Sequence, residues 1–196
     1  SGLNTKGDYG RNVFMEACYY GHKDVVKLFL EHSERIDLNA RDNCERTAIM
    51  IACQYGRKEV VNLFLEHSER IDLNARDKKG GTAFMRASIS GHKDVVKLLL
   101  ENSERIDLNA RDDNGKTAFM MVLHCACDSS KNPQLVKKIL QQPNIDINAK
   151  DENGDTALRL AVEHQNFEII QEIVNYGVER GIKHNVVSLR DLPPSY

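Results

Sequence analysis

Residues 21–42 read GHKDVVKLFLEHSERIDLNARD, and residues 91–112 read GHKDVVKLLLENSERIDLNARD, so the two stretches differ at only two positions. Residues 56–77, between them, read GRKEVVNLFLEHSERIDLNARD. The glycine that opens each stretch recurs every 35 residues, at Gly21, Gly56 and Gly91. A fixed period of this size predicts an array of similar units, each of which buries its apolar face mainly against its neighbours.

Two further units follow with small changes. The fourth ends at residues 145–151, IDINAKD, and is four residues longer, while the fifth opens at residues 151–158, DENGDTAL. We expect one domain over residues 1–183, followed by a C-terminal tail over residues 184–196. The predicted repeats within this domain span about 7–41, 42–76, 77–111, 112–150 and 151–183.

Each unit is predicted to hold a first helix, a turn, a second helix and a long polar arm. In the second unit, the hydroxyl of Thr47 can cap the first helix, and Gly56 suits the left-handed residue that ends it. Residues 60–65 supply a second, more apolar helix. Residues 71–77, IDLNARD, are too rich in Asn and Asp for a helix and indicate an extended arm that enters a turn. The equivalent helix caps in the other units are Asn12, Thr82, Thr117 and Thr156.

The recurring pattern resembles the ankyrin repeat family. The family signature runs roughly D-x-x-G-x-T-P-L-H-x-A-A-x-x-G-H-x-x-V-V, and residues 77–96 read DKKGGTAFMRASISGHKDVV, with DLNA at residues 107–110. The resemblance covers about residues 3–183 and recurs in register in five units. It implies an all-α ankyrin-repeat solenoid of stacked helix-turn-helix units with β-hairpin-like fingers, in which the fingers and the first helices form a concave face. Four arm residues also resemble asparagines that oxygen-dependent hydroxylases modify in this family: Asn39, Asn74, Asn109 and Asn148.

The chain departs from this signature in ways that carry expectations of their own. Methionine replaces the signature His in four units, so we expect a more hydrophobic seam at Met15, Met50, Met85 and Met120. Two extra residues around Ser68–Arg70 lengthen the arm. Glu172 replaces an apolar residue of the second helix, which predicts a face on which nothing stacks and therefore a C-terminal capping repeat.

Composition and charge exclude several classes of protein. The chain has 27 Lys and Arg against 29 Asp and Glu, which argues against a dedicated nucleic-acid binder. No apolar run approaches ~20 residues, so we expect no membrane span. Five Cys, an odd number, without a signal-like start predict reduced thiols and a cytoplasmic location, with the nucleus as the alternative. We also expect a monomer.

Catalytic, cofactor and metal signatures are missing from the sequence. It contains no phosphate-binding glycine-rich loop and no clear Ser/His/Asp set, so we expect neither an enzyme nor a cofactor. Residues 124–128, HCACD, hold one C-x-C pair, whereas a structural zinc site needs about four ligands. Residues 151–155, DENGD, begin like a calcium loop, but Thr156 and Val162 stand where Gly and Glu are required. We predict a helix end beside an insertion for the first motif and a finger turn for the second.

Tyrosine is concentrated at one end of the array. Tyr9 falls on the first finger, and Tyr19, Tyr20 and Tyr55 end the first helices of two units. The resemblance places these positions on the concave face, and tyrosine combines a large contact area with a polar group. We therefore predict a non-catalytic module that binds a protein or peptide on this face. The predicted binding residues are Tyr9, Arg11, Tyr19, Tyr20, Arg46, Tyr55, Lys78, Lys79, Arg86, Ile89, Asn114, Lys116 and His124.

The charge of the fingers changes along the array. Lys78 and Lys79 are basic, the next finger is mixed, and Glu152 and Asp155 are acidic. This order would steer a partner of opposite polarity, and the alternative is an ordinary mixed and solvated rim.

Two alternatives stay open at this point. The chain could be a structural spacer within a longer repeat protein, whose role is length and elasticity rather than recognition. Independently, Pro193, Pro194 and Tyr196 form a P-P-x-Y sequence that resembles ligands of WW domains, which makes such a domain a second candidate partner.

Overall fold

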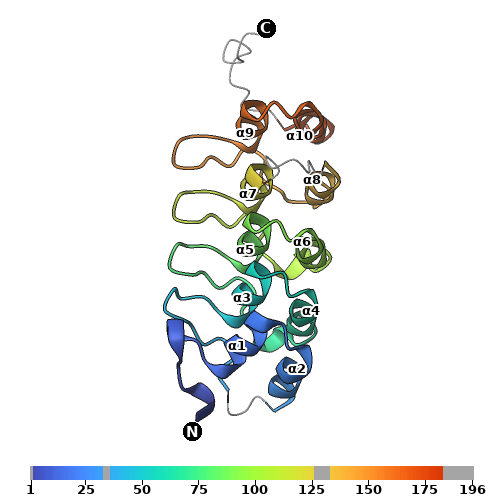
Figure 1. Ribbon diagram of the computed structural model, residues 1–196. Helices are drawn as coiled ribbons and strands as arrows, with labels where there is room; N and C mark the ends of the chain where they lie inside the picture. Colours follow the sequence, from blue (N-terminus) through green and yellow to red (C-terminus); the bar gives the residue numbers. More distant parts are fainter. Residues whose placement is uncertain (1, 33–35, 126–132, 183–196) are drawn as a thin grey trace.

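The computed structural model describes residues 2–32, 36–125 and 133–182, and its helices form two parallel columns with the fingers on the outer side of the first column (Figure 1). The first column holds α1 (Val13–Tyr20), α3 (Ala48–Gln54), α5 (Ala83–Ile89), α7 (Ala118–Cys125) and α9 (Ala157–Glu163). The second column holds α2 (Lys23–Glu31), α4 (Lys58–Glu66), α6 (Lys93–Leu100), α8 (Pro133–Leu140) and α10 (Phe167–Glu179). The all-α fold class is confirmed, because the only β-pairing within the described ranges is an isolated bridge between Arg111 and Thr117.

Short 3-10 helices complete the described chain. They are η1 (Gly2–Asn4), η2 (Asp8–Gly10), η4 (Ser68–Arg70) and η5 (Ser103–Arg105). None of the helices in the described part of the chain combines the length and the apolar character that a membrane crossing needs.

Most of the predicted helix caps are confirmed. The side chains of Asn12, Thr82 and Thr156 accept a hydrogen bond from the backbone N–H three residues on, and so does that of Thr117. The prediction for Thr47 is wrong, because its buried hydroxyl has no hydrogen-bond partner among the described residues. Helix α3 still begins at the equivalent position, so the extended backbone of Thr47 is sufficient to start it without a side-chain bond.

The core runs continuously through the array. The predicted methionine seam is confirmed, since Met15, Met50, Met85 and Met120 are each almost completely buried. Neighbouring units also share aromatic contacts: the ring of Phe14 on α1 packs edge-on against that of Phe64 on α4, with 5.8 Å between the centroids. Each unit therefore buries its apolar residues against the next one, as the sequence period predicts.

The arm of each unit is bonded to the arm of the next by an asparagine. The amide nitrogen of Asn74 donates to the carbonyl of Arg105 at 3.0 Å, and its amide oxygen accepts the backbone N–H of Asp107 at 2.8 Å. Asn39 and Asn109 make the same pair of bonds to the arms that follow them. We call this series the asparagine ladder, made by Asn39, Asn74 and Asn109.

The two extra residues of the arm have a structural use. They form the 3-10 turns η4 and η5, whose last residue is an arginine. Arg70 donates back to the carbonyl of Leu30 at 3.5 Å, and Arg105 donates to that of Leu65 at 3.2 Å. The longer arm therefore adds a bond to the preceding unit.

The prediction that Glu172 marks a face on which nothing stacks is wrong. Its carboxylate lies 3.1 Å from the ammonium of Lys137 on α8, so this residue faces the preceding unit rather than an open end. At the equivalent position of α6, Leu98 lines a surface pocket together with residues of the preceding second-column helix α4. Glu172 therefore replaces an apolar contact between units by an ion pair.

Some sequence predictions fall outside the described residues. These are the C-terminal tail 184–196 with its P-P-x-Y sequence, and most of the insertion predicted at residues 127–134, of which only Pro133 and Gln134 are described and begin helix α8. The repeat boundaries stay a prediction, with one helix pair lying in each predicted repeat.

Replacing Asn74 by Ala should lower the free energy of unfolding by about 1–3 kcal/mol, because two hydrogen bonds between units are lost and each contributes about 0.5–1.5 kcal/mol. Urea denaturation followed by circular dichroism measures this. Asn62→Ala is the matched control, since the side chain of Asn62 bonds to Glu66 within its own helix rather than to another unit among the described residues. Equal stability of the two variants would contradict a structural role for the asparagine ladder.

Candidate protein-binding site

Each finger is closed by the aspartate at its base. The backbone N–H of Asp42 donates to the carbonyl of Arg46 at 3.0 Å, and Asp77 pairs in the same way with Gly81 at 2.9 Å. One carboxylate oxygen of each aspartate also accepts the N–H groups two and four residues on. Asp112 and Asp151 repeat this arrangement, so residues 151–155 form the finger turn that the sequence predicts.

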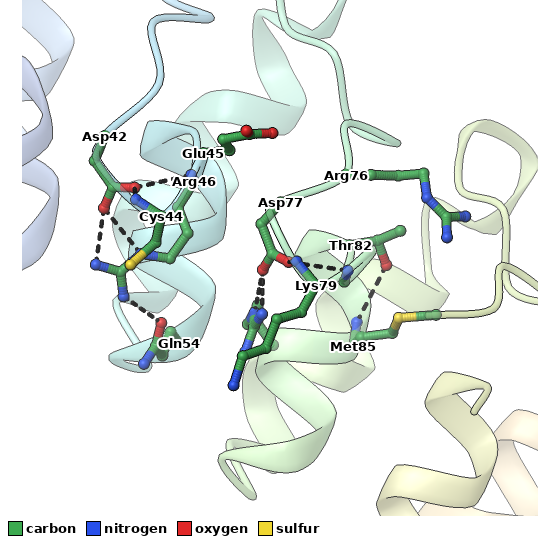
Figure 2. A network of polar contacts seen from close by, with 12 residues as sticks. Asp42, Cys44, Glu45, Arg46, Gln54, Arg76, Asp77, Lys79, Thr82 and Met85 are labelled. Carbon is green, nitrogen blue, oxygen red and sulfur yellow. Dashed lines mark hydrogen bonds and ion pairs between the residues drawn. The ribbon is translucent and has the colours of Figure 1, made fainter. Parts of the chain in front are cut away.

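The other carboxylate oxygen of Asp42 holds Arg46 (Figure 2). The Nε of Arg46 donates to Asp42 at 2.9 Å, and its Nη1 donates to the side chain of Gln54 at 2.9 Å. Burial alone would lower the pKa of this guanidinium, but the hydrogen bond and the charge of Asp42 raise the pKa above its ordinary value. Arg46 therefore stays charged and is already occupied within the chain.

In the next finger the arginine comes from a different position. Gly81 stands where the preceding finger has Arg46, and Arg86 on helix α5 forms an ion pair with Asp77 instead. A Cβ on Gly81 would lie 3.1 Å from the Arg86 guanidinium and 3.2 Å from the Asp77 carboxylate. Glycine at this position therefore leaves the space in which Arg86 reaches the buried Asp77 (Figure 2 shows Asp77).

Four tyrosines and an arginine form one contiguous group where the first finger meets the helix ends. The rings of Tyr19 and Tyr55 are 4.5 Å apart between centroids, and those of Tyr19 and Tyr20 are 4.9 Å apart. The guanidinium of Arg11 lies 4.5 Å from the ring centre of Tyr19 and 5.5 Å from that of Tyr9. We call this group the aromatic cluster: Tyr9, Arg11, Tyr19, Tyr20 and Tyr55.

The cluster combines a fixed base with exposed rings. Arg11 is buried, and its carboxylate neighbour Glu16 lies 3.6 Å away. Tyr19 and Tyr55 are half-buried against the core, whereas Tyr9 is 71% exposed and Tyr20 is 60% exposed. A cation between aromatic faces attracts both rings, so Arg11 holds Tyr9 and Tyr19 in place.

The remaining predicted residues lie farther along the array. Lys78 and Lys79 are exposed on the third finger, and Asn114 and the half-buried Lys116 are on the fourth. Ile89 is exposed at the end of α5. The lysines and Asn114 make no ring contact or ion pair with the aromatic cluster among the interactions given for the described residues.

Two residues that lie beside predicted binding residues were not predicted from the sequence. Gln54 bonds to Arg46, and the ring of His164 lies 6.1 Å from that of His124 between centroids. The repeat period could have indicated both residues. Gln54 lies 35 residues after Tyr19, at the equivalent position of the next unit, and His164 lies one residue beyond the position equivalent to His124.

Other features of the described residues lie away from this surface. A surface pocket of about 430 Å³ is bounded by α2, α4 and α6, in the second helix column, with Leu63 and Leu98 among its lining residues. The described residues contain no group of three His, Cys, Asp or Glu that could hold a metal ion. Cys18 and Cys53 are buried, which raises the pKa of both thiols, and Cys44 is exposed on the second finger.

The family of the chain is shown by its match to a family model. The family model described as ankyrin repeats (3 copies) matches residues 1–77, 69–151 and 123–187. The chain belongs to the ankyrin repeat family. A crystal structure of an ankyrin repeat domain from Acinetobacter baumannii is similar to it, with a TM-score of 0.78 and 23% identity over 90% of this chain and 87% of that one. No match was found among the curated proteins.

Membership supports the coarse functional expectation. Ankyrin repeats are generally protein–protein interaction modules and are typically non-catalytic. The likeness to the bacterial domain is a likeness of fold.

The two ways of neutralising a finger aspartate should be interchangeable. Arg86→Ile alone leaves Asp77 buried without a cation and should cost about 3 kcal/mol, near the lower end for a broken buried pair. Adding Gly81→Arg, which copies the second finger, should restore about 2 kcal/mol of that loss. Urea denaturation measures both, and a double variant no more stable than Arg86→Ile would contradict the exchange.

Alkylation should separate the exposed Cys44 from the buried Cys18 and Cys53. Iodoacetamide at pH 8 should modify Cys44 and spare Cys18 and Cys53, because the thiolate is the reactive form and burial raises the pKa of both buried thiols. Raising the pH to 9 should leave Cys18 and Cys53 unmodified for the same reason. Mass mapping of peptides gives the result, with urea-unfolded protein as the fully reactive control; rapid native modification of Cys53 would contradict its burial.

Proposed function

We propose that this ankyrin repeat chain is a non-catalytic module that binds a protein or peptide segment at the aromatic cluster. The observation that carries the proposal is the exposure of two tyrosine rings, Tyr9 and Tyr20, on a base fixed by Arg11. Pre-ordered aromatic side chains lose little conformational entropy on binding, so they supply much of the energy of a protein interface.

The position of the cluster supports the same reading. Its members come from a finger and from the ends of α1 and α3, so it spans two units rather than one. We call the side of the array formed by the fingers and the first helices the finger–helix surface. A partner that lies along this surface would meet the cluster at its N-terminal end (Figure 1).

A spacer role is the second candidate. The asparagine ladder favours it, because bonds repeated in register between units hold the array at a fixed length whether or not a partner is present. If the chain is a spacer, the exposed tyrosines are ordinary surface residues, and their removal changes neither the fold nor the binding of a partner.

Random peptides can test the proposal without an identified partner. A library of random 16-residue peptides displayed on phage is selected on the wild-type chain, and the selected peptides are measured by fluorescence anisotropy. The variant Tyr9→Ala/Tyr20→Ala should bind them at least about tenfold more weakly, a loss of about 1.4 kcal/mol or more. Both side chains are exposed, so circular dichroism and urea denaturation should show an unchanged fold.

A matched control removes apolar side chains of similar exposure elsewhere. Phe167 is 81% exposed and Val178 is 70% exposed, and both lie on α10 at the far end of the second column. Phe167→Ala/Val178→Ala should bind the selected peptides as the wild type does. Equal binding by both double variants and the wild type would contradict a binding role for the cluster and favour the spacer.

A further inference from the structure

The tips of successive fingers form one continuous row. The backbone N–H of Asn43 donates to the carbonyl of Tyr9 at 3.0 Å, and that of Lys78 donates to the carbonyl of Cys44 at 3.0 Å. Asp113 continues the row to Lys79 at 3.1 Å, and Glu152 continues it to Asn114 at 2.9 Å. Tyr9 and Lys79 therefore stand at equivalent places of the row, two units apart.

The third finger carries two exposed lysines that the ion pairs of the described residues do not use. The charge of Arg46 is balanced by Asp42 and that of Arg86 by Asp77, and Arg11 is buried between tyrosine rings. Lys78 and Lys79 are exposed, and the ion pairs of the described residues include neither of them. A carboxylate brought to this finger would meet two lysines without displacing an internal partner.

The fourth finger is mixed in charge, and the fifth is negative. Asp113 is exposed on the fourth finger, and Glu152 is exposed on the fifth. The fourth finger also carries Lys116, which is half-buried. The exposed groups at the finger tips are therefore Tyr9 on the first finger, Glu45 on the second, the lysine pair on the third, a mixed set on the fourth and Glu152 on the fifth. The positive third finger lies between the aromatic cluster and the negative fifth finger.

The distance between these blocks can be expressed in residues of a ligand. Packed helices lie about 8–10 Å apart, and an extended chain rises about 3.3 Å per residue, so one unit corresponds to about three ligand residues. The junction of Tyr19 with Tyr55 lies one to two units before the third finger, and the fifth finger lies two units beyond it. Successive blocks of a matching ligand are therefore about three to six residues apart.

We propose that this surface selects an extended peptide segment in which a bulky apolar side chain, a pair of carboxylates and a basic residue follow one another at that spacing. The inference rests on the proposed function and adds the chemistry of the partner. The apolar side chain packs against the aromatic cluster, the carboxylates pair with Lys78 and Lys79, and the basic residue faces Asp113 and Glu152. Complementary charges of this kind fix the register of a ligand and speed its association.

The same phage library tests this chemistry. Peptides selected on the wild-type chain should contain the three blocks in this order, in either chain direction, with Asp and Glu enriched between the apolar and the basic positions. Selection on Lys78→Glu/Lys79→Glu should remove the acidic block. Wild-type-selected peptides should bind this variant at least about tenfold more weakly, and raising the NaCl concentration from 50 to 500 mM should weaken their binding to the wild type.

A matched charge reversal controls for net charge. Lys23 and Lys58 are exposed on α2 and α4, in the other helix column, so Lys23→Glu/Lys58→Glu makes the same change in net charge away from this surface. It should bind the selected peptides within about twofold of the wild type.

The outcomes separate this inference from the proposed function. The acidic ligand would be overturned if acidic residues were as frequent in peptides selected on Lys78→Glu/Lys79→Glu as in peptides selected on the wild type. It would also be overturned if Lys78→Glu/Lys79→Glu and Lys23→Glu/Lys58→Glu weakened peptide binding equally. If the tyrosine double variant still lost binding in that case, the binding module would stand with a different partner chemistry. Blocks spaced by about six to twelve residues would indicate a helical ligand and overturn the extended segment. Failure of the wild type to select any peptide would overturn both proposals.

Discussion

Bonds that cross from one repeat to the next hold this molecule in shape. A single unit has two short helices and a polar arm, and its apolar side chains are buried only when a neighbour covers them. The asparagine ladder adds directional bonds to this apolar contact, since each of its side chains uses both the donor and the acceptor of its amide on the following arm. The apolar contact brings the units together, and the ladder fixes how far each is rotated and shifted relative to the next.

The finger aspartates fix the shape of the fingers, which lie beside the first helices. Each carboxylate accepts two backbone N–H groups and so closes the finger whose tip presents the exposed residues. The cation that balances the charge is supplied from the finger itself in one repeat and from the helix in the next. The positive charge of Arg46 and Arg86 therefore serves the finger, while that of Lys78 and Lys79 faces outward.

Much of this architecture could be predicted because the same residues recur in register. The period predicted the helix pairs, the methionine seam and four of the five caps, since each of these depends on contacts repeated in every unit. The predictions that failed assumed that one position has one role. Thr47 has the sequence of a cap but not its hydrogen bond, and Glu172 is charged because Lys137 opposes it rather than because the face is open.

The candidate site was harder to predict for the same reason. The tyrosines could be grouped from their positions, but the role of Arg11 between two rings depends on distances that a sequence does not contain. Arg46 and Arg86 were both expected to face a partner, and only the structure shows that each is occupied by an aspartate of its own finger. The exchange between Gly81 and Arg86 involves two positions at once, so neither residue indicates it alone.

The regular reach of the ladder has a consequence for how such a protein can change in length. Asn39 and Asn74 each bond to a carbonyl 31 residues ahead and to an N–H group 33 residues ahead, so both contacts belong to the next unit whatever lies beyond it. Removing or duplicating one of the 35-residue units joins equivalent residues and leaves the ladder bonds of the remaining units with equivalent partners. A gene rearrangement that gains or loses 35 codons therefore leaves the ladder contacts at the new junction unchanged, whereas a change of another length needs an altered loop.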